Sequence, residues 1–238
     1  MSWGMFCAIP CPLKIWDENA KLQSVVMLPF LGAVIGAVWA VVALVLKLIS
    51  APVLLTAAIV TVIPYLLSGF IHLDGFMDCC DAILSRRDLA ERQRILKDSH
   101  TGAFAVICVV IVFLVGFGTF ASFGENNVWK LVFLAGASRC ASAVSVLSFK
   151  PIGHSGYAKA FNSDHTGCKI AAWCVFLVFA VLPIILFGVS GIYALCAQLA
   201  AFLTILYGRA QLGGMSGDIS GYGITVGELV GAVALVLI

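Results

Sequence analysis

Residues 103–122 read Ala-Phe-Ala-Val-Ile-Cys-Val-Val-Ile-Val-Phe-Leu-Val-Gly-Phe-Gly-Thr-Phe-Ala-Ser and carry no charged side chain. A helix of about 20 residues crosses the hydrocarbon core of a bilayer, because each residue adds about 1.5 Å to its length. Backbone polar groups in lipid must be hydrogen-bonded within the segment, which a helix achieves. This stretch therefore predicts a transmembrane α-helix and decides the fold class.

The rest of the chain follows the same composition. Of its 238 residues, 62% are hydrophobic and only 11% are charged, against about 25% charged residues in soluble proteins. Such a chain cannot present a solvated surface, which excludes soluble, disordered, collagen-like and disulfide-scaffold classes. The formal charge of +2 argues against a nucleic-acid partner. We predict an all-α, polytopic membrane helix bundle forming one domain over 1–238, with about seven spans: 25–46, 51–70, 103–122, 128–148, 170–188, 190–208 and 222–238.

The charged residues gather in the N-terminal segment and in three polar stretches, 71–101, 149–169 and 209–221. Because successive spans reverse direction, all four lie on one side of the membrane. The opposite side carries only Lys47 and Lys130 as basic residues. Loops rich in Lys and Arg face the cytoplasm, so we predict that the polar side, and any active site built there, is cytoplasmic.

Residues 1–24 are expected to form an interfacial segment. Pro10, Pro12, Lys14 and Asp17 interrupt any apolar core, so no signal peptide is expected. Aromatic side chains in this segment suit the headgroup depth of a bilayer.

The most informative stretch is His72-Leu-Asp-Gly-Phe-Met-Asp-Cys-Cys-Asp81. Its aspartates, Asp74, Asp78 and Asp81, stand at i, i+4 and i+7 and share one face if the helix of the second span continues into them. Like charges on one helix face repel each other. A solvated acidic face is the alternative, but it would normally include basic residues, and none occurs here.

A divalent cation would neutralise this face. Carboxylate oxygens suit Mg²⁺, with Mn²⁺ as the alternative, and phosphate oxygens can complete the coordination. We therefore predict a metal site at Asp74, Asp78 and Asp81. Gly75 lacks a side chain beside the cluster, which favours the close approach of a ligand.

A basic stretch follows, and together the two make 71–101 the expected catalytic region. Arg92, Arg94 and Lys97 suit a phosphate or diphosphate substrate, although positive cytoplasmic loops are common in membrane proteins. Ser99 is a further candidate contact. Asp98 has two interpretations that the sequence leaves open: Asp98 or Ser99 caps the third span, or Asp98 is a fourth metal ligand.

The other polar stretches add candidate substrate contacts. Lys159 lies in a loop with mixed donors, which is also consistent with a plain linker. Gly214 and Gly217 belong to a glycine-rich turn that suits phosphate binding, and Asp218 adds a carboxylate beside it.

Two ionisable residues fall within predicted spans. Arg139 lies near the middle of the fourth span and Glu228 in the seventh. Charges inside a membrane are costly and usually face the bundle interior. The two residues form a structural ion pair, or Arg139 reaches an anionic substrate; the sequence leaves both interpretations open.

These residues carry a resemblance to a known family. The chain resembles the cobalamin 5'-phosphate synthases, also called adenosylcobinamide-GDP ribazoletransferases. Two departures stand out: adjacent cysteines where the family often has small residues, and Lys159 where an arginine is expected. The matching blocks, in order, are Ile9-Pro-Cys-Pro12, Leu28-Pro-Phe-Leu-Gly32, His72-Leu-Asp-Gly-x-x-Asp-x-x-Asp81, Lys97-Asp-Ser-x-x-Gly-x-Phe104 and Gly213-Gly-x-x-Gly-Asp218.

The resemblance implies an enzyme of a bacterial or archaeal cytoplasmic membrane. It implies Mg²⁺-dependent transfer of adenosylcobinamide phosphate from adenosylcobinamide-GDP to α-ribazole or its 5'-phosphate, releasing GMP. Partners would be these small molecules and the lipid bilayer, with a homo-oligomer or a complex with other cobalamin-assembly enzymes as a further expectation.

The resemblance also implies roles for residues. The expected catalytic groups are Asp78, Asp81 and Asp98, with Asp81 accepting the hydroxyl proton. Asp218 would join the metal ligands, and His72 would contact substrate, as would Gly75, Arg92, Arg94, Lys97, Ser99, Arg139, Lys159, Gly214 and Gly217.

Two other functions remain as alternatives. A CDP-alcohol phosphotransferase uses similar chemistry, but Asp78 and Cys79 stand where that family's motif has Ala and Arg. A transporter would need polar residues through the membrane and an outer mouth, and the opposite face of this chain is nearly uncharged.

Overall fold

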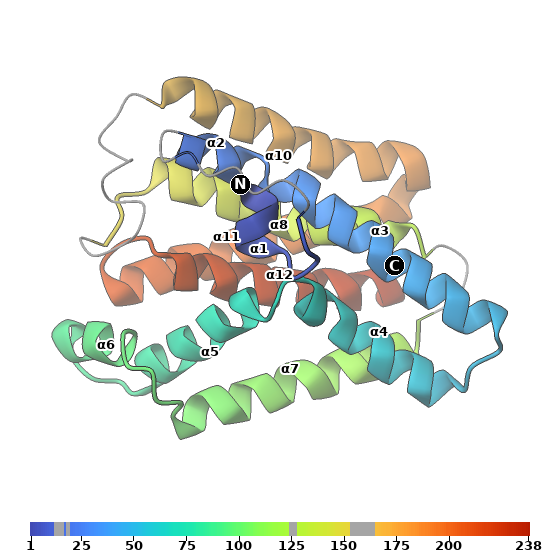
Figure 1. Cartoon of the computed structure of the whole chain (residues 1–238), viewed down its shortest axis with the longest axis horizontal. Coiled ribbons are helices and arrows are strands. Elements are labelled where there is room, and N and C mark those ends of the chain that lie inside the picture. The colour runs from blue at the N-terminus through green and yellow to red at the C-terminus, as the bar shows by residue number, and fades with distance from the viewer. Residues whose placement is uncertain (12–16, 18–19, 124–127, 153–164) are drawn as a thin grey trace.

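The computed structural model describes residues 1–11, 17, 20–123, 128–152 and 165–238. Among these residues it is helical throughout, and one isolated β-bridge, Pro151 to Met215, stands in place of any sheet. The all-α prediction is confirmed. The elements are α1 (Ser2–Phe6), α2 (Lys21–Val26), α3 (Leu28–Leu48), α4 (Val53–Leu67), α5 (Ile71–Leu84), α6 (Leu89–Ile95), α7 (Ala103–Ala121), α8 (Lys130–Ser148), α10 (Thr166–Phe187), η3 (Gly188–Gly191), α11 (Ile192–Leu212) and α12 (Gly217–Leu237) (Figure 1).

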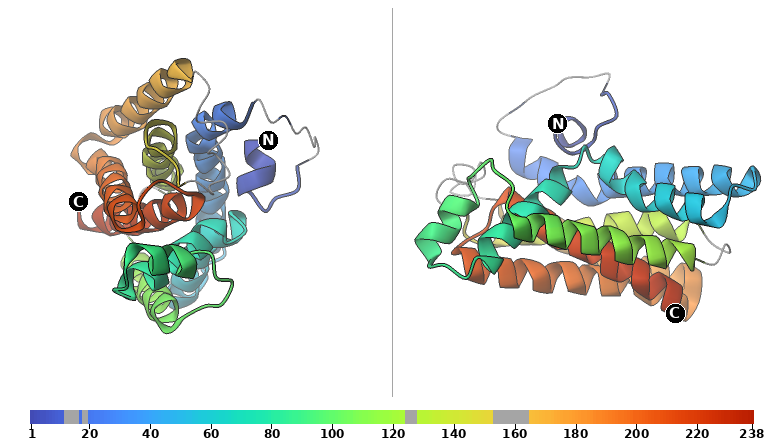
Figure 2. Two further views of the ribbon diagram at one scale, coloured as in Figure 1. Left: turned by 90° about the vertical axis from the view of Figure 1, so that its left-hand side faces the viewer. Right: turned by 90° about the horizontal axis from the view of Figure 1, so that it is seen from below.

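Helix α8 forms the centre of the bundle. It is the most buried of the long helices and packs against α3, α10, α11 and α12. Viewed along the helices, α8 lies in the middle of this group (Figure 2, left). Its sequence explains the position, because residues 135–143 are Ala, Gly, Ser and Cys except for Arg139, and such small side chains let neighbouring backbones approach closely.

Among the described residues, five helical segments are long and apolar enough to cross a membrane, or six if the bent pair α4–α5 counts as one span. The chain is thus a multi-pass membrane protein, but the predicted number of seven is not confirmed. One of the five segments is Thr166–Leu212. The chain turns back at η3. A hydrogen bond from the Gln198 side chain to the Phe176 carbonyl at 2.9 Å shows this, because a straight helix would hold these two residues about 33 Å apart. Figure 1 shows α10 and α11 running beside each other.

The helix of the second span does not continue into the acidic residues. It stops at Leu67, and α5 leaves at 91° to α4. Gly69 and Phe70 both have positive φ, 62° and 61°, a left-handed conformation that no helix continues through. The Ser68 hydroxyl donates back to the carbonyl of Pro64 at 2.9 Å and closes α4. The expected continuous helix was wrong, and the acidic residues instead follow a helix break near the centre of the molecule (Figure 1).

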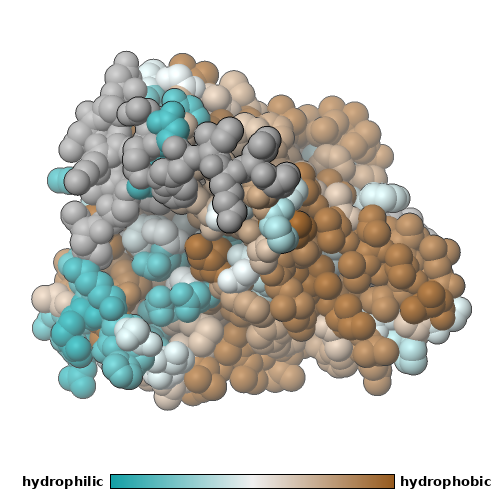
Figure 3. Space-filling model, in the orientation of Figure 1, coloured by the Kyte–Doolittle hydropathy of each residue, from teal (hydrophilic) through white to brown (hydrophobic). Residues whose placement is uncertain are grey.

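The polar stretches meet at one end of the bundle, as the charge pattern predicts. The Met215 amide donates to the Lys150 carbonyl at 3.0 Å, and the Gln93 side chain donates to the Leu212 carbonyl at 2.8 Å. Hydrophilic surface gathers at that end, while the opposite end is largely hydrophobic on the face seen in Figure 3.

The N-terminal helix α1 lies against the break between α4 and α5. The Ala8 amide donates to the Leu67 carbonyl at 2.8 Å, and the Ser2 hydroxyl donates to the Ser24 carbonyl at 2.6 Å. Part of the predicted interfacial segment, residues 12–16, 18 and 19, lies outside the described residues. The described part packs on the bundle and helps to form the site.

Candidate functional site

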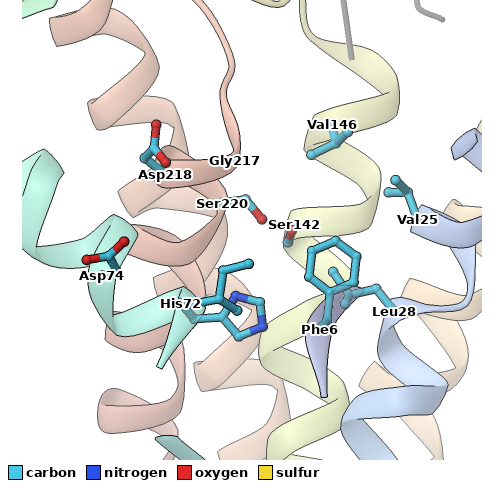
Figure 4. Close-up of a pocket in the computed structure, with 11 residues that line it drawn as sticks. Phe6, Val25, Leu28, His72, Asp74, Ser142, Val146, Gly217, Asp218 and Ser220 are labelled. Carbon is cyan, nitrogen blue, oxygen red and sulfur yellow. Dashed lines mark hydrogen bonds between the residues drawn. The ribbon is translucent and has the colours of Figure 1, made fainter. Parts of the chain in front are cut away.

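A cavity of about 130 Å³ opens beside the helix break. Helices α5, α8 and α12 provide its polar residues, and α1, α2 and α3 provide an apolar wall. Figure 4 shows Asp74 and Asp218 on one side and Phe6, Val25 and Leu28 on the other. The lining consists of Phe6, Val25, Leu28, Ile71, His72, Asp74, Ser142, Val146, Gly217, Asp218 and Ser220.

A close crossing of α5 and α12 places the two acidic elements together. A Cβ on Gly75 would stand 2.7 Å from Cα of Asp218, and a Cβ on Gly221 would stand 2.6 Å from the His72 carbonyl oxygen. Only glycine permits backbones to approach this closely. The group that approaches Gly75 is therefore the backbone of Asp218, whereas the sequence suggested a ligand.

The structure brings several of the predicted metal ligands together. Asp74 and Asp218 both line the cavity. Asp78 is half-buried one turn beyond Asp74, and the charges of Asp74, Asp218 and Asp81 all act on it. Within the described residues, no group of three or more His, Cys, Asp or Glu side chains could hold a metal ion. The predicted four-carboxylate set is thus not assembled as one cluster.

Asp81 turns toward another helix. Its carboxylate accepts hydrogen bonds from the Gly102 amide at 2.6 Å and the Ala105 amide at 2.9 Å. It thereby caps the N-terminus of α7, which has no capping side chain of its own. Of the two interpretations left open for Asp98, capping of this helix by Asp98 or Ser99 is not what the structure shows, because an aspartate from α5 occupies the position.

Asp98 lies in the connection between α6 and α7. Its carboxylate accepts hydrogen bonds from the His100 amide at 3.1 Å and from Nδ1 of His100 at 2.7 Å. These hydrogen bonds hold the pKa of Asp98 below its usual value, and the charge of Arg94 adds to the effect. Asp98 does not line the cavity, so its role as a metal ligand or catalytic group stays a prediction.

The two arginines of α6 are engaged within the protein. Nη1 of Arg92 donates to the Gln211 carbonyl at 3.1 Å and to the Gln211 side chain. It thereby provides a partner for a backbone carbonyl in the last turn of α11. Arg94 pairs with Glu91 at 2.7 Å and lowers the pKa of that carboxyl. Lys97 and Ser99 are exposed. None of these predicted substrate contacts lines the cavity, and their roles stay predictions.

Of the two predicted glycines in the glycine-rich turn, only one lines the cavity. Gly214 packs against Ile152, whereas Gly217 lines the cavity. The Ser216 hydroxyl accepts from the Ile219 amide and caps α12, which fixes the start of the helix that carries Asp218. Lys159, also a predicted contact, lies outside the described residues.

Arg139 and Glu228 form a buried ion pair. Their side chains are 1% and 6% exposed, and Nη1 of Arg139 lies 2.5 Å from Oε1 of Glu228. The same nitrogen donates to the Ala135 carbonyl at 2.7 Å. Of the two interpretations left open, the structure shows the ion pair. Arg139 is not part of the cavity lining.

Sequence reasoning missed several lining residues. Phe6 stacks on His72 with ring centroids 6.0 Å apart, and the hydroxyls of Ser142 and Ser220 hydrogen-bond to each other across α8 and α12. Phe6 gave no signal, because an aromatic residue in an apolar chain is ordinary. The serines inside apolar spans were a weak signal, since polar side chains in a membrane often join helices.

Comparison with known proteins agrees with the resemblance. The sequence model described as cobalamin-5-phosphate synthase matches residues 1–236. An adenosylcobinamide-GDP ribazoletransferase of Clostridium perfringens (strain 13) is 39% identical over 244 residues, covering 100% of this chain and 96% of that protein. Its namesake in Clostridium botulinum (strain Alaska E43) is 37% identical over 238 residues, covering 97% and 93%. No solved structure matches. The family match spans nearly the whole chain, and the chain therefore belongs to the cobalamin-5-phosphate synthase family.

Proposed function

We propose that this chain transfers adenosylcobinamide phosphate from adenosylcobinamide-GDP to α-ribazole or its 5'-phosphate and releases GMP. The curated relatives bear the name adenosylcobinamide-GDP ribazoletransferase. The observation that carries the proposal is the cavity that carboxylates from both α5 and α12 line on one side (Figure 4). Asp74 and Asp218 form this acidic side, with Asp78 one turn beyond Asp74, and no Lys or Arg side chain lines the cavity among the described residues.

The acidic side fits Mg²⁺ by the chemistry of its donors. Magnesium is usually held by one or two carboxylates together with substrate phosphates and water, not by a complete protein cage. Asp74 and Asp218 on facing helices supply such a pair, and Asp78 stands next to them. Bound there, the ion would neutralise charge on the diphosphate. Asp81 is less suited to this role than the sequence suggested, because both its carboxylate oxygens already bind backbone amides.

The transfer exchanges one bond to phosphorus for another. A ribose hydroxyl oxygen bonds to the phosphorus attached to the corrinoid, and the P–O bond to GMP breaks. The hydroxyl proton moves to a carboxylate, for which we propose Asp78. It is half-buried and makes no hydrogen bond within the described residues. Its oxygens are therefore available to accept a proton, whereas those of Asp81 are engaged.

We place this reaction at the cytoplasmic face of the bacterial or archaeal cytoplasmic membrane. The positive residues of the polar end support that orientation. The bilayer would then hold the long apolar helices, and the cavity would receive its substrates from the cytoplasm.

The test is a turnover assay on the full chain in nanodiscs. Purified protein receives adenosylcobinamide-GDP, α-ribazole and Mg²⁺, and GMP release and corrinoid product are followed, with EDTA as a control. We expect metal-dependent turnover. Asp78→Asn should lower kcat by roughly 100-fold or more, as expected for loss of a general base. Asp88→Asn is the matched control, because Asp88 is exposed and caps only α6.

Two results would contradict the proposal. Wild-type turnover that survives in Asp78→Asn would remove Asp78 from the catalytic site. Folded protein that releases no GMP but consumes CDP-alcohol substrates would replace the proposed reaction with phospholipid synthesis.

A further inference from the structure

Helix α6 contacts the turn that joins α11 to α12. Nη1 of Arg92 donates to the Gln211 carbonyl at 3.1 Å, and the Gln93 side chain donates to the Leu212 carbonyl at 2.8 Å. The next residue, Gly213, has a φ of 79°, and a Cβ on it would stand 3.2 Å from Nε2 of Gln93. Two consecutive side chains of α6 therefore hold the chain at the point where it leaves α11.

The segment after α8 holds the same turn from another direction. The Met215 amide donates to the Lys150 carbonyl at 3.0 Å, and the Ile152 amide donates to the Met215 carbonyl at 2.9 Å. A Cβ on Gly214 would stand 2.9 Å from the Ile152 backbone nitrogen. The turn is thus fixed by two elements that belong to neither of the helices it joins.

The turn leads directly to a carboxylate of the cavity. The Ser216 hydroxyl donates to Oδ2 of Asp218 at 3.3 Å and accepts from the Ile219 amide at 3.3 Å. One buried side chain therefore connects the end of the turn both to the start of α12 and to the Asp218 carboxylate. Asp218 lines the cavity together with Asp74 (Figure 4), so a shift of the turn would move one of these carboxylates relative to the other.

We propose that Arg92 and Gln93 are positioning residues, which hold this turn so that Asp218 stays beside Asp74 in the cavity. The inference rests on the proposed function, which places the substrate phosphates at this acidic side. Positioning matters for the reaction because a misplacement of about 1 Å can slow catalysis roughly 100-fold. Asp218 depends on such support, since it follows an irregular turn and turns are more mobile than the helices they join.

The geometry distinguishes this role from a substrate contact. Arg92 is half-buried, and its Nε donates to the Arg87 carbonyl at 2.6 Å while Nη1 binds Gln211. Gln93 carries no charge that would attract a phosphate. Neither residue lines the cavity. The two side chains share a contact with the turn and no contact with the site itself.

The test uses variants of the full chain in nanodiscs. Gln93→Ala removes one neutral donor to the turn, and Arg92→Gln removes the guanidinium that binds Gln211. Glu91→Gln is the matched control on the same helix, because the Glu91 carboxylate pairs with Arg94 within α6. Amide hydrogen exchange, measured in EDTA, reports on the turn without metal or turnover, and GMP release reports on the reaction.

We expect both donor variants to loosen the turn and slow the reaction. The amides of Met215 and Ile219 should exchange roughly 10-fold faster in Gln93→Ala and in Arg92→Gln, as expected for the loss of a hydrogen bond. GMP release should fall by a similar factor. Glu91→Gln should match wild type in both measurements. Unchanged exchange in both donor variants would overturn the inference, because α6 would then not hold the turn.

A double-variant cycle separates positioning from direct contact. If Arg92 acts through Asp218, Arg92→Gln should cause no further loss in a protein that already carries Asp218→Asn. Ser216→Ala, which keeps the carboxylate and removes its link to the turn, serves as a second background where the residual turnover of Asp218→Asn is too low. Losses that multiply in both backgrounds, with normal turnover in Gln93→Ala, would place Arg92 on the substrate and overturn the inference.

This inference and the proposed function fail in different ways. A wild type that releases no GMP overturns the reaction, while exchange in Gln93→Ala still decides whether α6 holds the turn. Normal GMP release in both donor variants leaves the reaction standing and removes the positioning role. Gln93→Ala also covers the case in which Arg92→Gln fails to fold, since it removes a single neutral hydrogen bond.

Discussion

Arg139 and Glu228 place two opposite charges inside the bundle, and each charge is compensated by the other. Removing one partner leaves an uncompensated buried charge, which typically costs 3–5 kcal/mol, whereas replacing both with apolar residues is often neutral. We predict that Arg139→Gln and Glu228→Gln each lower the free energy of unfolding of the detergent-held protein by about 3–5 kcal/mol, seen as a lower midpoint of thermal unfolding. The double variant Arg139→Met/Glu228→Leu should recover most of the loss.

This experiment also decides the remaining question about Arg139. A substrate contact would appear as lost turnover in Arg139→Gln with stability near that of wild type, and the double variant would not restore activity. Thermal unfolding and GMP release, measured on the same preparations, separate the two roles.

Gly75 controls the distance between the acidic elements. A Cβ at this position would meet Cα of Asp218 at 2.7 Å, and overpacking of this kind costs about 1–3 kcal/mol. We predict that Gly75→Ala separates α5 from α12 and lowers both thermal stability and turnover. Gly118→Ala is the control, because a Cβ on Gly118 of α7 would meet nothing within 4 Å. It should be neutral or more stable by up to about 1 kcal/mol, and a comparable loss in both variants would contradict the close-packing argument.

At the scale of elements, a side chain of α5 caps the N-terminus of α7. Helix α7 starts at residues far in sequence from the carboxylate that caps it, and Asp81 links it to α5. An acidic residue at a helix N-terminus accepts hydrogen bonds from the free amides there, and its negative charge interacts favourably with the helix dipole. The start of α7 is therefore fixed by the same helix that carries Asp74 and Asp78.

We predict that Asp81→Ala destabilises the protein by about 0.5–2 kcal/mol, the usual cost of losing an N-cap. Amide hydrogen exchange should become faster at Gly102 and Ala105 and stay unchanged in α6. Asp88→Ala removes the cap of α6 and should give the opposite pattern. Unchanged protection of both amides in Asp81→Ala would show that the cap contributes nothing to α7.

At the scale of the whole molecule, the polar and apolar ends set the orientation in the membrane. Ser99 and Ser122 are exposed and flank α7, one on each side of its apolar residues. In a variant without native cysteines, a membrane-impermeant maleimide should label Ser122→Cys in intact cells. It should label Ser99→Cys only after the membrane is permeabilised. The reverse pattern would place the acidic cavity on the outer side of the membrane.

Much of the site could be predicted from local sequence, but only as a set of candidates. The aspartates at i, i+4 and i+7 were visible at once, because their spacing belongs to one helix. The departure of Asp81 toward α7 was not visible, since its partners stand 21 and 24 residues away. The interaction of Arg92 with Gln211 spans 119 residues, and nothing in the basic stretch itself indicated that its arginine would bind a helix end.

The class of this protein follows from its sequence alone, because the lengths of the apolar runs and the placement of the charges between them are local properties that decide whether a segment can cross a bilayer. The sequence also determined which carboxylates belong to one helix. Tertiary packing was needed to show that the chain breaks between α4 and α5 before the acidic residues, that the Asp218 backbone contacts Gly75, and that Phe6 stacks on His72. Each of these depends on backbones and rings that pack together across long separations in the chain, and such contacts are chosen by the shape of the whole bundle.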